Sequence, residues 1–237
     1  MREKLKIFGV VLLASFSACS VMISTAVASP GLTSDGSVTL DGTEKGFPRL
    51  TAFGTSLACQ GSTLTGHSPG TQEPLPSGAA FLTVTFDFKQ EKCVVTEGSG
   101  NHKATVTVNG CDLGVRIGST FLGGGGRYEA PGEIVCPSGN DIAVDVYPFS
   151  GSELGGVVCT MTIKPQTGLT GAIGPWLENT FGEPGKLTFG GTYEGIRISR
   201  SGAGCATEEG PIGQLDLNWL LSGTNAAGAS TAIELSD

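Results

Sequence analysis

The sequence has few charged side chains, only two histidines and no run of basic residues. Charged residues make up 15% of the 237 positions, and 14 Lys and Arg stand against 22 Asp and Glu. The resulting net charge of −8 repels nucleic acid and anionic membrane surfaces, because both are polyanions. The chain also has no Cys-x-x-Cys pair with which to build a zinc site. The sequence therefore predicts no nucleic-acid binding, no metal and no other cofactor.

The long apolar run lies at the N-terminus, and no later run approaches the length of about 18 residues that a membrane span needs. Residues 1–28 combine a basic start, an apolar stretch from Ile7, and Ala26-Val27-Ala28, whose small residues suit signal peptidase. We expect a signal peptide that is cleaved, which predicts a secreted, extracellular or envelope-associated product that is not in the membrane. The alternatives are an uncleaved anchor and a lipoprotein modified on Cys19, although the usual preceding Leu is missing.

Six cysteines follow the leader, and an even number in an exported chain predicts disulfides, with 15 possible pairings. Residues 50–110 and 158–225 each hold a Cys, a Thr- and Gly-rich stretch, and a strand that runs into a second Cys. This likeness suggests an internal duplication, with coincidence among Gly- and Thr-rich strands as the alternative. A duplication favours the pairs Cys59–Cys93 and Cys159–Cys205 and leaves Cys111–Cys136.

Alternation of apolar and polar residues with a period of two dominates the chain, and Asn-Gly, Asp-Gly and Gly-Gly turn signals separate the stretches. No capped helical period follows the leader. The pattern predicts an all-β fold, an antiparallel β-sandwich or barrel of about ten or more short strands that disulfides cross-link. The alternating stretches are residues 80–89, 104–108, 141–146, 157–164, 215–221 and 229–235.

The domain organisation predicted from these patterns is simple. Residues 29–48 form an N-terminal arm, and residues 49–237 form a single β domain with a possible two-repeat organisation. Residues 65–77, which hold three prolines, are expected to form a long loop. The glycine run at residues 123–126 lacks the Gly-Lys-Ser/Thr ending of a phosphate loop, so we interpret it as a hairpin tip.

Candidate catalytic groups are weak. Residues 66–70 match the Gly-x-Ser-x-Gly nucleophile elbow, but Pro69 has no N–H with which to stabilise an oxyanion. Asp141 and Asp145 on one strand would lie about 13 Å apart, whereas glycosidases place their two carboxyl groups about 5–9.5 Å apart. The adjacent pair at residues 208–209 is interpreted as part of a solvated loop. The sequence therefore identifies no catalytic residue, and a carboxylate pair drawn from two strands remains the alternative.

The aromatic residues give a weak indication of a binding surface. Trp219 alternates with leucines and is expected in the core. Trp176 and Phe181 lie in a Gly-bounded segment, residues 174–182, which we expect to be a loop. An exposed aromatic ring beside polar groups can stack on a sugar or contact another protein, so these two residues are the candidate ligand surface. The alternative is that Trp176 folds back and closes one end of the fold.

Over about residues 50–237, the chain shares the order and spacing of several motifs, most of them around cysteines, with a known family. The motifs are residues 104–111, 134–139, Cys159 with residues 164–169, and the closing hairpin at residues 223–228. With them the chain resembles a family of exported, cysteine-containing β-proteins that occur in many copies in high-GC Gram-positive soil bacteria. That family has no assigned activity, so the resemblance carries over no catalytic residue. The glycine run and the long segment around Trp176 depart from the shared pattern.

Together these features predict an exported β module with a binding or structural role at the envelope or in the medium, and not an enzyme. Envelope polysaccharide or protein is the expected kind of partner. One alternative is a hydrolase that acts on polysaccharide with two carboxylates from separate strands. Two acidic residues in a concave cleft beside Trp176 would favour it, and acids scattered over convex faces would count against it. The other alternative is self-association through strand edges.

Overall fold

The computed structural model describes residues 31–34, 36–71, 82–88, 92–97, 100–118, 126–148, 155–172 and 174–236, and no α-helix occurs in them. Within this part of the chain no helix is long and apolar enough to cross a membrane. The expected signal peptide lies outside the described residues, as do most of the glycine run and the second half of the expected loop at residues 65–77.

The described residues are mostly strand. The strands are β1 (Gly31–Ser34), β2 (Val38–Glu44), β3 (Arg49–Ala52), β4 (Thr55–Cys59), β5 (Thr63–Ser68), β6 (Leu82–Asp87), β7 (Cys93–Glu97), β8 (Gly100–Thr107), β9 (Asp112–Val115), β10 (Arg127–Glu129), β11 (Gly132–Val135), β12 (Ile142–Tyr147), β13 (Cys159–Ile163), β14 (Gln166–Leu169), β15 (Trp176–Asn179), β16 (Lys186–Gly202), β17 (Cys205–Asn225), β18 (Ser230–Thr231) and β19 (Ile233–Ser236).

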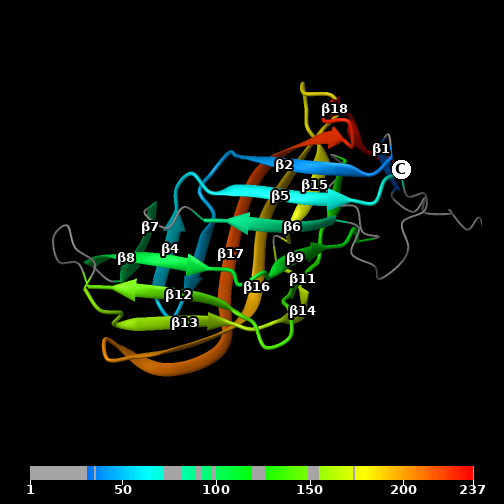
Figure 1. The fold of residues 1–237 in the computed structure, drawn as a ribbon. Helices are drawn as coiled ribbons and strands as arrows, with labels where there is room; N and C mark the ends of the chain where they lie inside the picture. The colour runs from blue at the N-terminus through cyan, green and yellow to red at the C-terminus, as the bar shows by residue number, and fades with distance from the viewer. Residues whose placement is uncertain are drawn as a thin grey trace, which may run out of the picture.

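Eight antiparallel ribbons close into a barrel. Six of them are pairs of consecutive strands with a short break between, namely β2/β3, β4/β5, β6/β7, β8/β9, β11/β12 and β13/β14, and the other two are the long strands β16 and β17. Each ribbon pairs with the next along the chain, and β17 pairs back with β2 and β3, which closes the ring. In Figure 1, β2, β5 and β6 lie in one half, β8, β12 and β13 lie in the other, and β16 and β17 run through both. The predicted all-β, antiparallel fold is confirmed in its barrel form.

The remaining strands lie outside the ring. Strand β15 pairs with the first part of β16, and β10 pairs with β15. Strands β1 and β19 form a separate two-stranded sheet, in which Leu32, Ile233 and Leu235 are buried. The Asn179 side chain donates to the carbonyl of Leu235 and accepts from its N–H, both at 2.8 Å, so β19 is tied to β15. Both termini of the described chain therefore meet at one end of the barrel.

Two boundaries differ from the sequence prediction. Residues 38–44, assigned to an N-terminal arm, form β2, which pairs with β17 and with β5 inside the ring. Residues 65–68, assigned to a loop, belong to β5. Both segments are short and rich in Thr or Gly, and their partner β-strands lie elsewhere in the sequence. Pairing with those partners overrides the weak local signal.

Three disulfides cross-link neighbouring parts of the barrel. Cys59 on β4 is bonded to the directly opposite Cys93 on β7, Cys111 to Cys136, and Cys159 on β13 to Cys205 at the start of β17. These are the three pairs that the likeness between residues 50–110 and 158–225 favours. Their loops follow one another along the chain and none encloses another.

Candidate functional site

A chamber of about 70 Å³ lies inside the barrel. All eight ribbons contribute to its wall, and several lining residues, such as Pro48, Val108 and Ile142, flank the breaks between paired strands. The chamber therefore lies where the ribbons pass from one half of the barrel to the other. One lining residue from each ribbon in turn is Leu50, Leu57, Phe86, Val106, Val144, Ile163, Ile196 and Leu215.

The wall of the chamber is apolar. Among the described lining residues Asp112 alone is charged, and its carboxylate accepts a hydrogen bond from the exposed Thr85 hydroxyl at 2.5 Å. Because the neighbouring Leu113 is buried and side chains alternate along a strand, the Asp112 carboxylate lies on the outer face. Phe86 stacks on Phe88 at 5.8 Å and contacts Trp219 at 6.1 Å, measured between ring centroids. The inner surface consequently offers hydrocarbon contacts and no charge.

Trp176 lies in strand β15, so the loop expected there is wrong. Its indole packs against Gly190 of the neighbouring strand, where an added Cβ would lie 2.8 Å from the ring. The Arg127 guanidinium lies over the ring at 4.3 Å from its centroid and also bonds the Glu178 carboxylate at 2.5 Å. Since the half-buried indole is already covered by a guanidinium, Trp176 does not present a free face to a sugar.

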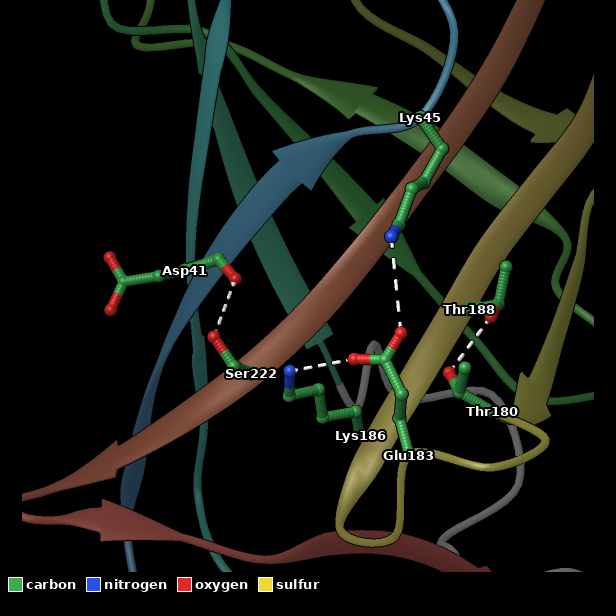
Figure 2. A network of polar contacts seen from close by, with 7 residues as sticks. All are labelled: Asp41, Lys45, Thr180, Glu183, Lys186, Thr188 and Ser222. Atoms are coloured by element: carbon green, nitrogen blue, oxygen red, sulfur yellow. Dashed lines mark hydrogen bonds and ion pairs between the residues drawn. The ribbon is translucent and has the colours of Figure 1, made fainter.

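Phe181 lies in the turn between β15 and β16, and its side chain is fully exposed. Beside it, the Glu183 carboxylate accepts a hydrogen bond from the Lys186 ammonium at 2.7 Å and lies 3.9 Å from the Lys45 ammonium (Figure 2). The Lys186 hydrogen bond, followed by the charges of Lys186 and Lys45, lowers the pKa of Glu183. We call Lys45, Phe181, Glu183 and Lys186 the hairpin patch; it carries one net positive charge on an acidic protein.

Hydrogen bonds join the strands next to the hairpin patch. The hydroxyls of Thr180 and Thr188 are hydrogen-bonded at 2.8 Å across the two strands that flank the turn, and Ser222 on β17 donates to the carbonyl of Asp41 at 3.3 Å (Figure 2). Leu220, which lies opposite Thr188 and Thr43 on the strands beside it, is 7% exposed but does not belong to the interior core. Thr180, the residue before Phe181, is therefore tied to β16, and Leu220 is covered on the outer face of the barrel beside it.

A groove of about 250 Å³ lies next to β10 and β15. Among the described residues that line it, Glu129 is the one carboxylic acid, whereas the hydrolase alternative needs two. Its described lining residues are Glu129, Pro131, Thr170, Gly171, Gly174 and Pro175.

Two of the acidic residues considered above, Asp145 and Glu208, have partners on neighbouring strands. Asp145 accepts a hydrogen bond from Thr160 at 2.7 Å. Glu208 bonds Arg200 at 2.7 Å, in strand β17 rather than in the expected loop, because this segment pairs with β16. In the described part of the chain, no group of three or more His, Cys, Asp and Glu side chains could hold a metal ion.

The nucleophile-elbow match lies on β5 instead of a strand-to-helix turn. Ser68 is fully buried and its hydroxyl has no hydrogen-bond partner among the described residues, while His67 faces Ser37 at 3.3 Å on the other side of the strand. Because adjacent residues of a strand point to opposite faces, this serine and this histidine do not meet.

Fold and site together define a closed, disulfide-bonded antiparallel β-barrel with a charged hairpin patch outside and an apolar chamber inside. No family model, curated protein or solved structure matches the chain. Sequence reasoning found Phe181 but missed Lys45, Glu183 and Lys186, which come from two turns far apart in the sequence. It also missed the chamber, because alternation shows which side chains point inward and not whether they fill the interior.

Proposed function

We propose that the chain is an exported β-barrel module that binds an anionic polysaccharide of the cell envelope through the hairpin patch and has no chemistry of its own. The fully exposed Phe181 side chain, in the same turn as Glu183 of the Lys45–Glu183–Lys186 network, is the observation that carries this proposal. Three disulfides support an oxidising, extracellular setting.

The chemistry of the patch suits a sugar that bears acidic groups. An aromatic face takes the apolar face of a pyranose ring, and the Phe181 side chain is fully exposed, whereas Arg127 covers the ring of Trp176. The Lys45 and Lys186 ammoniums outnumber the Glu183 carboxylate between them and are the groups that would bind an acidic substituent of the sugar, whereas the exposed Asp41, two strands from Lys186, marks the acidic border of the patch. Binding of this kind weakens as salt rises, because exposed charges are screened.

The first test is co-sedimentation of the oxidised mature chain, residues 29–237, with purified envelope of the producing cell. We expect Phe181→Ser to lower the apparent affinity about tenfold, because it removes the exposed aromatic ring that would stack on the sugar. Ile212→Ser removes another exposed apolar side chain, from the half of β17 away from the patch, and serves as the matched control with unchanged binding.

The outcomes separate the alternatives. An equal loss of affinity for the envelope in the Phe181→Ser and Ile212→Ser variants would contradict binding through the hairpin patch. Release of soluble sugar would favour the polysaccharide hydrolase instead. Sedimentation of the protein without envelope would favour self-association through strand edges.

A further inference from the structure

We propose that the chamber inside the barrel is a second binding site, which takes the slim hydrocarbon end of an amphiphilic molecule. This site is separate from the hairpin patch, so the inference does not rest on the proposed polysaccharide binding. It is carried by three features of the chamber: its unfilled volume, the chemistry of its wall and its incomplete enclosure.

The interior is filled unevenly. Trp219, Tyr193 and Phe189 are fully buried and fill their part of the barrel. Around the chamber, by contrast, inward-facing apolar side chains remain partly exposed although they belong to the interior wall. These side chains are Phe86, Phe88, Val108, Ile142 and Leu215. Large side chains pack one region tightly and leave beside it a space that the described residues do not fill.

The wall selects against polar ligands. The described side chains that point into the chamber are apolar, and the Asp112 carboxylate is held outside by Thr85. A sugar or an ion that entered would lose its hydrogen bonds to water and gain none in return. An alkyl chain or an unsubstituted ring loses nothing of this kind and gains contacts from several ribbons at once.

The size of the chamber limits what enters. Its volume of about 70 Å³ is roughly half of a cavity that holds benzene, which corresponds to about three carbon atoms. The chamber is partly open and not sealed, so the rest of a longer molecule can stay outside it. The ligand is therefore a molecule with a slim hydrocarbon end and a remainder in water.

The test uses straight-chain alcohols from ethanol to octanol as probes of the oxidised mature chain, with carbon-13 labelled methyl groups observed by NMR. We expect shifts to centre on the methyls of Val106, Ile163 and Leu215, all of which line the chamber. The dissociation constant should fall about fourfold for each added methylene until the chamber is full, and then change little. Glucose, which has no hydrocarbon end, should shift none of these methyls.

Two variants change the chamber in opposite directions. Val108→Phe adds four carbon atoms to the wall and should raise the dissociation constant for hexanol at least tenfold. Thr107→Phe places the same side chain on the outer face of the adjacent position and should leave it unchanged. Leu215→Ala enlarges the chamber, so in this variant the dissociation constant should continue to fall with each added methylene up to longer alcohols than in the wild type.

The proposal is overturned by shifts that spread over outer-face methyls, or by a folded Val108→Phe variant that binds hexanol as the wild type does. If Val108→Phe does not fold, Leu215→Ala decides the question. The proposal is also overturned if, in that variant, the dissociation constant depends on the length of the alcohol as it does in the wild type.

Discussion

Reduction of the three disulfides is expected to unfold the barrel at 37 °C. The bonded cysteines are separated by 34, 25 and 46 residues, and none of the three loops encloses another. In the chain-entropy model each bond then restricts the unfolded chain independently and contributes roughly 3.5–4 kcal/mol. About 11 kcal/mol in total is comparable with the whole free energy of unfolding of an ordinary domain, which is about 5–15 kcal/mol.

The measurement is thermal unfolding by circular dichroism of the oxidised protein and of the reduced, alkylated protein. As an intermediate case, Cys111→Ala combined with Cys136→Ala removes the bond that closes the shortest of the three loops and should lower the melting temperature by about 7–14 °C. A reduced protein that melts within a few degrees of the oxidised one would show that the strand pairing alone holds the barrel.

Local alternation predicted several barrel strands and their inner faces, among them β6, β12, β13 and the second half of β17, but not the closure of the barrel. Leu217, Trp219 and Leu221 alternate as expected and are buried. Closure depends on β17 pairing with β2, in which Leu221 lies opposite Gly42, and no local pattern links positions so far apart. For the same reason the arm assigned to residues 29–48 was wrong in its second half, because β2 becomes a barrel strand through partners distant in the sequence.

The two residues of the candidate ligand surface, Trp176 and Phe181, lie in different surroundings in the structure, and the reason is physical. Phe181 lies at a tight turn, where its side chain is fully exposed. Trp176, five residues earlier, is next to Pro175 and Gly174, which locally favour a loop. Pairing with β10 and β16 makes the segment a strand, and Arg127, about 50 residues away in the sequence, covers the indole. A long-range contact of that kind leaves no signal in the local sequence.

Glycine makes up 38 of the 237 residues, and at the Trp176 segment one glycine is required for a close approach of two backbones. Gly191 on β16 has a φ of +105°, and an added Cβ would lie 2.6 Å from the Gly174 carbonyl oxygen and 2.9 Å from the Pro175 Cα. Gly195, on the same strand, also has a positive φ, +72°, but nothing lies within 4 Å of the position its Cβ would take.

The pair Gly191→Ala and Gly195→Ala therefore separates backbone strain from steric overlap. A positive φ alone costs an alanine about 1–2 kcal/mol, which is the loss expected for Gly195→Ala in urea unfolding. Gly191→Ala should lose about 3 kcal/mol or more, because the methyl group must also push β15 away from β16. Displacement of β15 would separate Trp176 from Gly190, so the emission of Trp176, read in a Trp219→Phe background, should shift in the Gly191 variant alone. Equal losses of stability and unchanged emission in both variants would mean that β15 is not pressed against Gly191. The burial of Trp176 would then depend on Arg127, which covers its ring, and not on the close approach of β15 to Gly190 and Gly191.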